Sequence, residues 1–150
     1  MPTQTVVQTF TDAELAAWRG FLRAHSALVK ELDADLEEQH QLPLTSYDVL
    51  TNLADQADGR MRMRDLADAV VLSRSGLTRL VDRLQREGLI DREQCASDAR
   101  GAYAVLTATG RARLREAQPL HRESVRRRFL SRFSDDELRE LAAFWERLQA

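Results

Sequence analysis

An arginine-rich stretch, residues 72–89 (LSRSGLTRLVDRLQREGL), carries the residues whose types and spacing suit chemistry with a nucleic acid. Its apolar residues recur at helical spacing and would line one buried face: Leu77, Leu80, Val81 and Leu84. The other face would present Arg74, Ser75, Thr78, Arg79, Asp82, Arg83 and Arg86. The major groove of B-DNA admits a helix and offers hydrogen-bond acceptors to arginine. The pattern predicts a DNA-recognition helix, and the alternative is a surface helix with solvated arginines.

The charge of the chain supports the first interpretation once it is divided along the sequence. The 150 residues carry a net charge of −2. Residues 1–59 have three basic and ten acidic side chains, residues 60–113 have eleven and seven, and residues 114–150 have eight and seven. The net charges of these segments are −7, +4 and +1. Positive charge is therefore concentrated around the predicted recognition helix, as phosphate binding requires.

Composition limits the class of protein. The chain is long enough for one domain, or for one lobe with an interaction extension, and a hydrophobic fraction of 43% supports a core. No apolar run is long enough for a membrane span, and the N-terminus lacks the pattern of a signal peptide. The single cysteine, Cys95, cannot form an internal disulfide. We expect a cytoplasmic protein without a membrane partner.

The residues around the recognition helix predict a winged helix-turn-helix. A helix over Asp65–Val70 and a turn at residues 71–73 would precede the recognition helix, with Leu66 and Ala67 packed against Leu77 and Leu80. Gly88 suits a left-handed helix C-terminus. Three strands are expected: an edge strand at Arg60–Met63, and a hairpin of Leu89–Gln94 and Ala102–Leu106 joined by residues 95–101, which would form the wing.

Longer helices are expected on both sides of this lobe. Capping boxes at Thr11–Glu14, Thr45–Asp48 and Ser134–Glu137 each predict a helix start. Thr107 would cap a helix that runs to about Phe133, with a bend at Pro119. The predicted fold is mainly α with a small β-wing. Residues 1–10 would be loosely ordered, 43–107 would form the winged helix-turn-helix lobe, and 11–42 and 108–150 would form dimerisation helices.

Assembled in order, these segments resemble the MarR family of bacterial winged-helix transcription regulators over roughly residues 10–148. The resemblance is carried by residues 44–50 (LTSYDVL), 65–67 (DLA), 78–84 (TRLVDRL), 87–89 (EGL), 98–100 (DAR) and 106–111 (LTATGR). It implies a homodimer whose terminal helices interlock. The sequence supports this independently, because these helices carry more apolar surface than a small lobe can cover: Trp18, Phe21, Phe129, Phe133, Phe144 and Trp145.

The resemblance also implies roles for individual residues on double-stranded DNA. Arg74, Ser75, Thr78 and Arg79 would reach base edges, and an arginine bound to guanine through two hydrogen bonds contributes about 1–3 kcal/mol of discrimination. Ser73 would cap the helix and contact phosphate, and Arg83 and Arg86 would contact phosphates farther along. In the wing, Arg100 would enter the minor groove and Asp98 would steady nearby arginines. Family members often have Asp-Pro and a second arginine where this chain has Cys95, Ala96 and Ala99, so the wing tip is less charged.

Many members of this family release DNA when a small effector or an oxidant acts on them. A site for an aromatic or phenolic effector is expected between the first helix and the lobe, near Trp18, Arg19, Arg23, His25, Arg64 and Asp65. The alternative is that Trp18 belongs to the dimer core and the arginines are solvated. Cys95 is expected to be an unreactive residue at a strand end rather than a redox switch.

Other functions are not favoured by the sequence. His25, His40 and His121 are widely separated in the sequence and none forms a close metal-ligand pair, which leaves only a histidine joined by acids across a dimer. No catalytic motif is present, so we expect no metal, no cofactor and no enzyme activity. The predicted function is that of a repressor released from a pseudo-palindromic operator by a small effector. The alternative is a winged-helix module that binds another protein, for which the outer face of the recognition helix offers no apolar contact residues.

Overall fold

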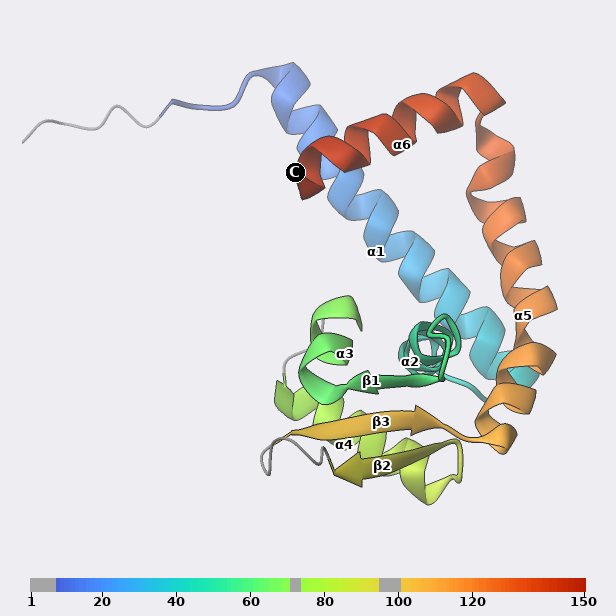
Figure 1. Ribbon diagram of the computed structural model, residues 1–150. Coiled ribbons are helices and arrows are strands. Elements are labelled where there is room, and N and C mark those ends of the chain that lie inside the picture. The colour runs from blue at the N-terminus through green and yellow to red at the C-terminus, as the bar shows by residue number, and fades with distance from the viewer. Residues whose placement is uncertain (1–7, 71–73, 95–100) are drawn as a thin grey trace, which may run out of the picture.

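The chain folds into a lobe of short helices and a small sheet, from which long helices extend (Figure 1). The computed structural model describes residues 8–70, 74–94 and 101–150. The fold is mainly helical with one small antiparallel sheet, as the sequence predicts. Its elements are α1 (Asp12–His40), α2 (Leu44–Ala54), β1 (Arg60–Arg62), α3 (Met63–Val70), α4 (Arg74–Arg86), β2 (Ile90–Gln94), β3 (Ala102–Leu106), α5 (Ala108–Arg128), the 3-10 turn η1 (Leu130–Arg132) and α6 (Asp135–Gln149).

The sheet confirms the predicted wing hairpin and edge strand. Its strand order is β1-β3-β2, and both pairs are antiparallel. In the hairpin, Ile90 pairs with Leu106 and Gln94 pairs with Ala102. The hairpin loop, residues 95–100, and the predicted turn at residues 71–73 lie outside the described residues.

The hydrophobic core lies within the lobe and at its junction with α1 and α5. The predicted partners Leu66 and Ala67 of α3 are buried in the same cluster as Leu77 and Leu80 of α4. From the long helices this cluster includes the buried residues Leu36, Leu114 and Ala117. The other buried members are Leu42, Leu44, Tyr47, Val49, Leu50, Leu53, Val81, Leu84, Leu89, Ile90, Ala104 and Leu106. The lobe therefore has a closed core within one chain.

Helix starts follow the local sequence at three of the four predicted caps that lie within the described residues; the fifth, Ser73, lies outside them. The capping boxes of Thr11 and Ser134 are both present, and Thr107 Oγ1 accepts a hydrogen bond from the Gly110 amide at 2.9 Å. The predicted box at Thr45–Asp48 is wrong, because α2 begins at Leu44, two residues before the start that a Thr45 cap implies, and its N-cap, Pro43, makes no side-chain cap bond. Instead Asp33 of α1 accepts a hydrogen bond from the Leu44 amide at 2.8 Å. A long-range contact thus satisfies the first donor of α2.

The C-terminal helices differ from the expectation in one place. The helix α5 continues through Pro119 but ends at Arg128 rather than near Phe133. Phe129 has φ −124° and ψ −66°, outside the helical region, and the 3-10 turn follows. After this turn α6 runs back across α1 (Figure 1), where the ring centroids of Phe21 and Trp145 are 5.7 Å apart.

Candidate nucleic-acid interface

The predicted recognition helix is present as α4, with the predicted division between its two faces. Leu77, Val81 and Leu84 are at most 1% exposed, and Leu80 is 8% exposed. On the other side, Ser75, Thr78, Arg79 and Arg86 are exposed. Apolar packing thus fixes one face of the helix on the lobe and leaves the polar face accessible.

The helix α4 ends with a left-handed glycine, as the sequence predicts for Gly88. Gly88 has φ +76°, a left-handed conformation in which a side chain would be strained. The next amide, of Leu89, donates to the Leu84 carbonyl at 2.9 Å, and the Gly88 amide donates to the Gln85 carbonyl at 3.0 Å. These bonds satisfy carbonyl groups that the end of a helix otherwise leaves free. The chain then enters the wing directly.

Arg92 of β2 connects the wing to the recognition helix. Its Nη2 lies 2.6 Å from the Asp82 carboxylate and donates to the Thr78 carbonyl at 3.2 Å. Asp82 therefore faces a cation within the protein, although the sequence placed it among the outward-facing residues. This ion pair neutralises an acid on the otherwise basic outer face of α4. Arg92 was not among the predicted site residues, because its partners lie on another element.

Arg83 connects α4 to α2. Its Nη2 donates to Ser46 Oγ at 3.0 Å, and Ser46 is only 1% exposed. The arginine is half-buried, so its guanidinium is positioned rather than freely solvated. Ser46 was also missed, since nothing in its local sequence indicates a partner 37 residues away.

The predicted DNA-contact residues differ in how far the structure describes them. Arg79 and Arg86 are exposed, and neither has an ion-pair partner among the described residues. Ser75 and Thr78 lie on the same side of α4. Ser73, Asp98, Arg100 and Cys95 lie outside the described residues, as does the side chain of Arg74.

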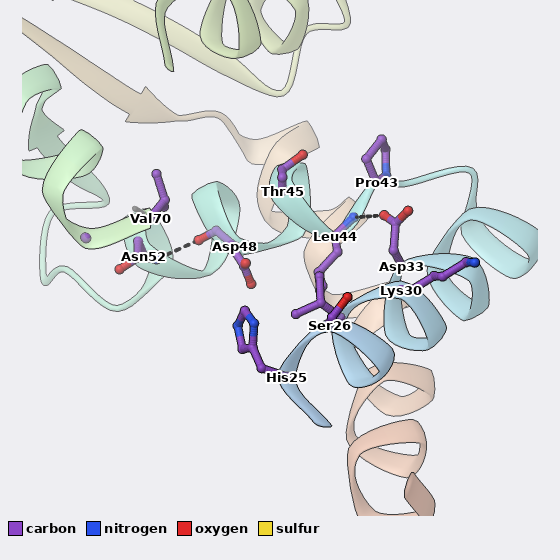
Figure 2. Close-up of a pocket in the computed structure, with 12 residues that line it drawn as sticks. His25, Ser26, Lys30, Asp33, Pro43, Leu44, Thr45, Asp48, Asn52 and Val70 are labelled. Carbon is purple, nitrogen blue, oxygen red and sulfur yellow. Dashed lines mark hydrogen bonds between the residues drawn. The ribbon is translucent and has the colours of Figure 1, made fainter. Parts of the chain in front are cut away.

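A groove of about 1070 Å³ separates α1 from α2 and α3, at the place where the sequence predicts an effector site. Figure 2 shows His25 of α1 and Asp48 of α2 facing one another across it. Although Asp48 is partly accessible to solvent, desolvation raises the pKa of its carboxyl. The groove is lined by His25, Ser26, Val29, Lys30, Asp33, Pro43, Leu44, Thr45, Asp48, Asn52, Ala69 and Val70. Five of these twelve residues are apolar, and seven are polar or charged.

Of the six residues near which the effector site is predicted, only His25 lines this groove; Arg19, like Arg23, is exposed on α1. Trp18 is 52% exposed and stacks near Phe21, with ring centroids 6.2 Å apart, on the part of α1 that α6 crosses. Arg23 is exposed, and Arg64 and Asp65 form an exposed ion pair with each other at 3.7 Å. The structure therefore does not gather these residues into one described cavity.

Two further features bear on the class of protein. Within residues 8–70, 74–94 and 101–150, no group of three or more His, Cys, Asp or Glu side chains is placed to hold a metal ion. No helix in the same ranges is both long and apolar enough to cross a membrane.

Two short helices packed on one another, α3 and the arginine-bearing α4, followed directly by a β-hairpin, define the class of winged helix-turn-helix proteins. Comparison with known proteins identifies the family. Residues 40–101 match the model of the MarR family. AbsC, a MarR family transcriptional regulator from Streptomyces coelicolor, has a structure with a TM-score of 0.88; it is 37% identical, and the match covers 95% of each chain.

Two other relatives agree with this assignment. The structure of Sco3205, a MarR family regulator from the same organism in complex with DNA, has a TM-score of 0.89 and is 32% identical, with 95% of this chain and 89% of the other covered. The transcriptional regulator YkoM of Bacillus subtilis is 31% identical over 124 residues, which is 83% of this chain and 78% of the relative. The chain belongs to the MarR family of winged-helix transcriptional regulators, which are not enzymes.

Proposed function

We propose that the protein is a repressor that recognises a specific DNA operator through residues 73–86 and a wing around Asp98 and Arg100. The observation that carries this proposal is Arg79, exposed on the first turns of a helix whose other face is buried, and without an ion-pair partner among the described residues. An unpaired guanidinium at this end of the helix is available to a guanine edge. The similarity to a regulator whose structure contains DNA supports the proposal.

The protein acts as a homodimer in this proposal. Large apolar side chains remain exposed on α1, α6 and the segment before α6, and a second copy would cover them: Trp18, Phe21, Leu22, Val29, Phe133, Phe144, Trp145 and Leu148. Residues 11–42 and 108–150 would form the dimerisation helices, and residues 43–107 the DNA-binding lobe. Two lobes related by a two-fold axis would read half-sites about 34 Å apart, so the operator would be pseudo-palindromic.

A small molecule bound in the α1–α2 groove would control DNA binding. The groove lies between a proposed dimerisation helix and the lobe, so a ligand there would favour one position of the lobe over another. The dimer would have two shapes, one with each position of the lobe. The ligand could lower operator affinity only by as much as its own affinity differs between these two shapes. An aromatic or phenolic compound is the first class to test, because Val29, Leu44 and Val70 provide apolar walls.

DNA recognition is tested by fluorescence anisotropy with the intergenic DNA upstream of the gene and a scrambled duplex of the same length. The wild type is expected to prefer the upstream DNA, and Arg79→Ala is expected to lose about 1–3 kcal/mol of that preference. Weak and steeply salt-dependent binding to both duplexes would leave only nonspecific phosphate contact and contradict the proposal.

The effector proposal has its own test. Salicylate and benzoate are titrated into the complex of the protein with its preferred duplex, and then into the complex of a His25→Ala variant. A fall in wild-type DNA affinity that the variant lacks would support the groove as the site. Unchanged DNA affinity across this series would count against an aromatic acid as the effector.

A further inference from the structure

A small hollow lies between the start of α2 and the exposed face of α4. It has a volume of about 250 Å³ and is lined by Thr45, Gly76, Arg79, Leu80 and Arg83. We call it the α2–α4 hollow. Two of its five lining residues are arginines and none is acidic. Its charge therefore suits an anion.

One of these arginines is held in place by the core of the lobe. Arg83 Nη2 donates to Ser46 Oγ at 3.0 Å, and Ser46 is 1% exposed. Because that hydroxyl cannot move far, the guanidinium stays at the hollow, with its remaining N–H donors available. Fixing the side chain beforehand reduces the entropy that binding would otherwise remove.

Thr45 supplies a neutral donor on the opposite wall. Its side chain is exposed, and no hydrogen bond from its hydroxyl to a described residue is present. Figure 2 shows the Thr45 side chain on the side of α2 away from His25 and Asp48. Thr45 lines both the α1–α2 groove and this hollow, whereas Asp48, the one acid of α2, lines the groove alone.

We propose that Thr45 and the Ser46-bound Arg83 bind one phosphate of the DNA backbone in the α2–α4 hollow, beside the bases that Arg79 contacts. A phosphodiester has the charge and the acceptor oxygens that a hydroxyl and a guanidinium recognise together. A hollow on the exposed face of α4 lies where the backbone passes when this helix enters the major groove. The inference rests on the proposed DNA recognition, and it adds Thr45 as a contact and Ser46 as a positioning residue.

The test uses the full chain in anisotropy titrations with the upstream and scrambled duplexes across a salt series. Thr45→Val removes the hydroxyl with little change of shape. It is expected to weaken binding to both duplexes by the same factor, about tenfold, at every salt concentration. Thr109→Val, an exposed threonine in the first turn of α5, is the matched control and is expected to bind like the wild type.

Arg83→Gln and Ser46→Ala separate the charge from its position. Arg83→Gln is expected to reduce the slope of log affinity against log salt by about one for each lobe, because one phosphate contact is lost. Ser46→Ala keeps the charge, so affinity falls while the slope is unchanged; its melting temperature is measured in parallel, since Ser46 is buried. Arg126→Gln, on the exposed side of α5, is the charge control.

The outcomes distinguish this inference from the proposed function. Normal affinity of Thr45→Val together with a normal salt slope of Arg83→Gln would overturn the phosphate site, even if the wild type prefers the upstream DNA. A loss confined to the upstream duplex would also overturn it, because it would make Thr45 a base contact. If inorganic phosphate stabilises the wild type but not Thr45→Val, and both bind DNA equally, the hollow binds free phosphate instead. If the wild type binds the upstream and the scrambled duplex equally well, the proposed function itself is refuted.

Discussion

The DNA-binding lobe and the terminal helices use apolar side chains in opposite ways. In the lobe, α2 alone buries six residues, and the inner face of α4 is at most 8% exposed. The helices α1 and α6 are described throughout, yet α1 has one buried residue, Leu36, and α6 has none. Trp18, Phe144 and Leu148 on these helices are 52%, 45% and 75% exposed.

The lobe is therefore complete in one chain, whereas the terminal helices are not. The lobe closes its own core, so it can present α4 rigidly to a ligand. The terminal helices expose several large apolar side chains, and exposed apolar surface of this kind marks a protein interface. In the proposed function, the lobe, whose core is complete in one chain, reads DNA, and the terminal helices, which a second copy would cover, hold two lobes together.

The largest expected effect comes from opening the lobe core. Leu84→Ala removes a side chain with 0% exposure and is expected to lower the free energy of unfolding by about 2–5 kcal/mol. The same change at Leu148, 75% exposed near the end of α6 in the single chain, is expected to cost less than about 1 kcal/mol at protein concentrations low enough to dissociate the proposed dimer. Urea denaturation measures both. Equal losses of unfolding free energy at Leu84 and Leu148 would contradict the difference in packing between the lobe and the terminal helices.

A smaller effect is expected where the wing meets α4. Arg92→Gln removes a half-exposed ion pair with Asp82 and is expected to cost about 1 kcal/mol of stability or less. Preference for the upstream DNA should fall several-fold, because the Thr78 carbonyl loses the donor that positions the helix. The control is Glu93→Gln, which breaks the pair with Arg60 on the other face of β2. The same loss of preference in this control would show that Arg92 has no specific positioning role.

The smallest effect is expected at the ion pair that joins α5 to α1. Hydrogen bonds from Arg128 to Asp35, at 2.9 Å each, hold the pKa of this carboxyl below its ordinary value near 3.8. Stability from this pair is therefore present above about pH 4 and is lost as the pH falls through the lower pKa of the folded state.

Urea denaturation of the wild type and Asp35→Asn at pH 7, 5, 4 and 3 checks this sign. The wild type should be the more stable at pH 7, and the difference should shrink below about pH 4. Glu38→Gln, at an exposed carboxylate on the same helix, is the control. A difference that is independent of pH would show that the Asp35 carboxylate contributes no charge-dependent stability.

The sequence predicted the features that depend on neighbours in the chain. The two faces of α4, the left-handed Gly88 and the capping boxes at Thr11 and Ser134 all follow from spacing within one or two helical turns. The wing hairpin follows from two strand-like segments on either side of a stretch of small and turn-forming residues. In each case a local pattern and the tertiary fold favour the same conformation.

Features that depend on distant residues could not be predicted in this way. The cap of α2 comes from Asp33, eleven residues earlier, which is why the expected Thr45 box does not form. Ser46 and Arg83 meet only because α2 and α4 pack together, and Arg92 meets Asp82 only through the wing. The predicted effector residues are spread over separate surfaces for the same reason, since the path of α1 over the lobe is set by packing.

The most direct test of the central claim is sedimentation velocity of the wild type, alone and with the labelled upstream duplex. The account predicts a particle of twice the 17.1 kDa chain mass that binds DNA as a dimer. Phe21→Glu should sediment as a single chain and lose most of the DNA preference, whereas Ala27→Glu, on the polar side of α1, should behave like the wild type. A wild type that sediments at the mass of one chain while still preferring the upstream DNA would contradict the account.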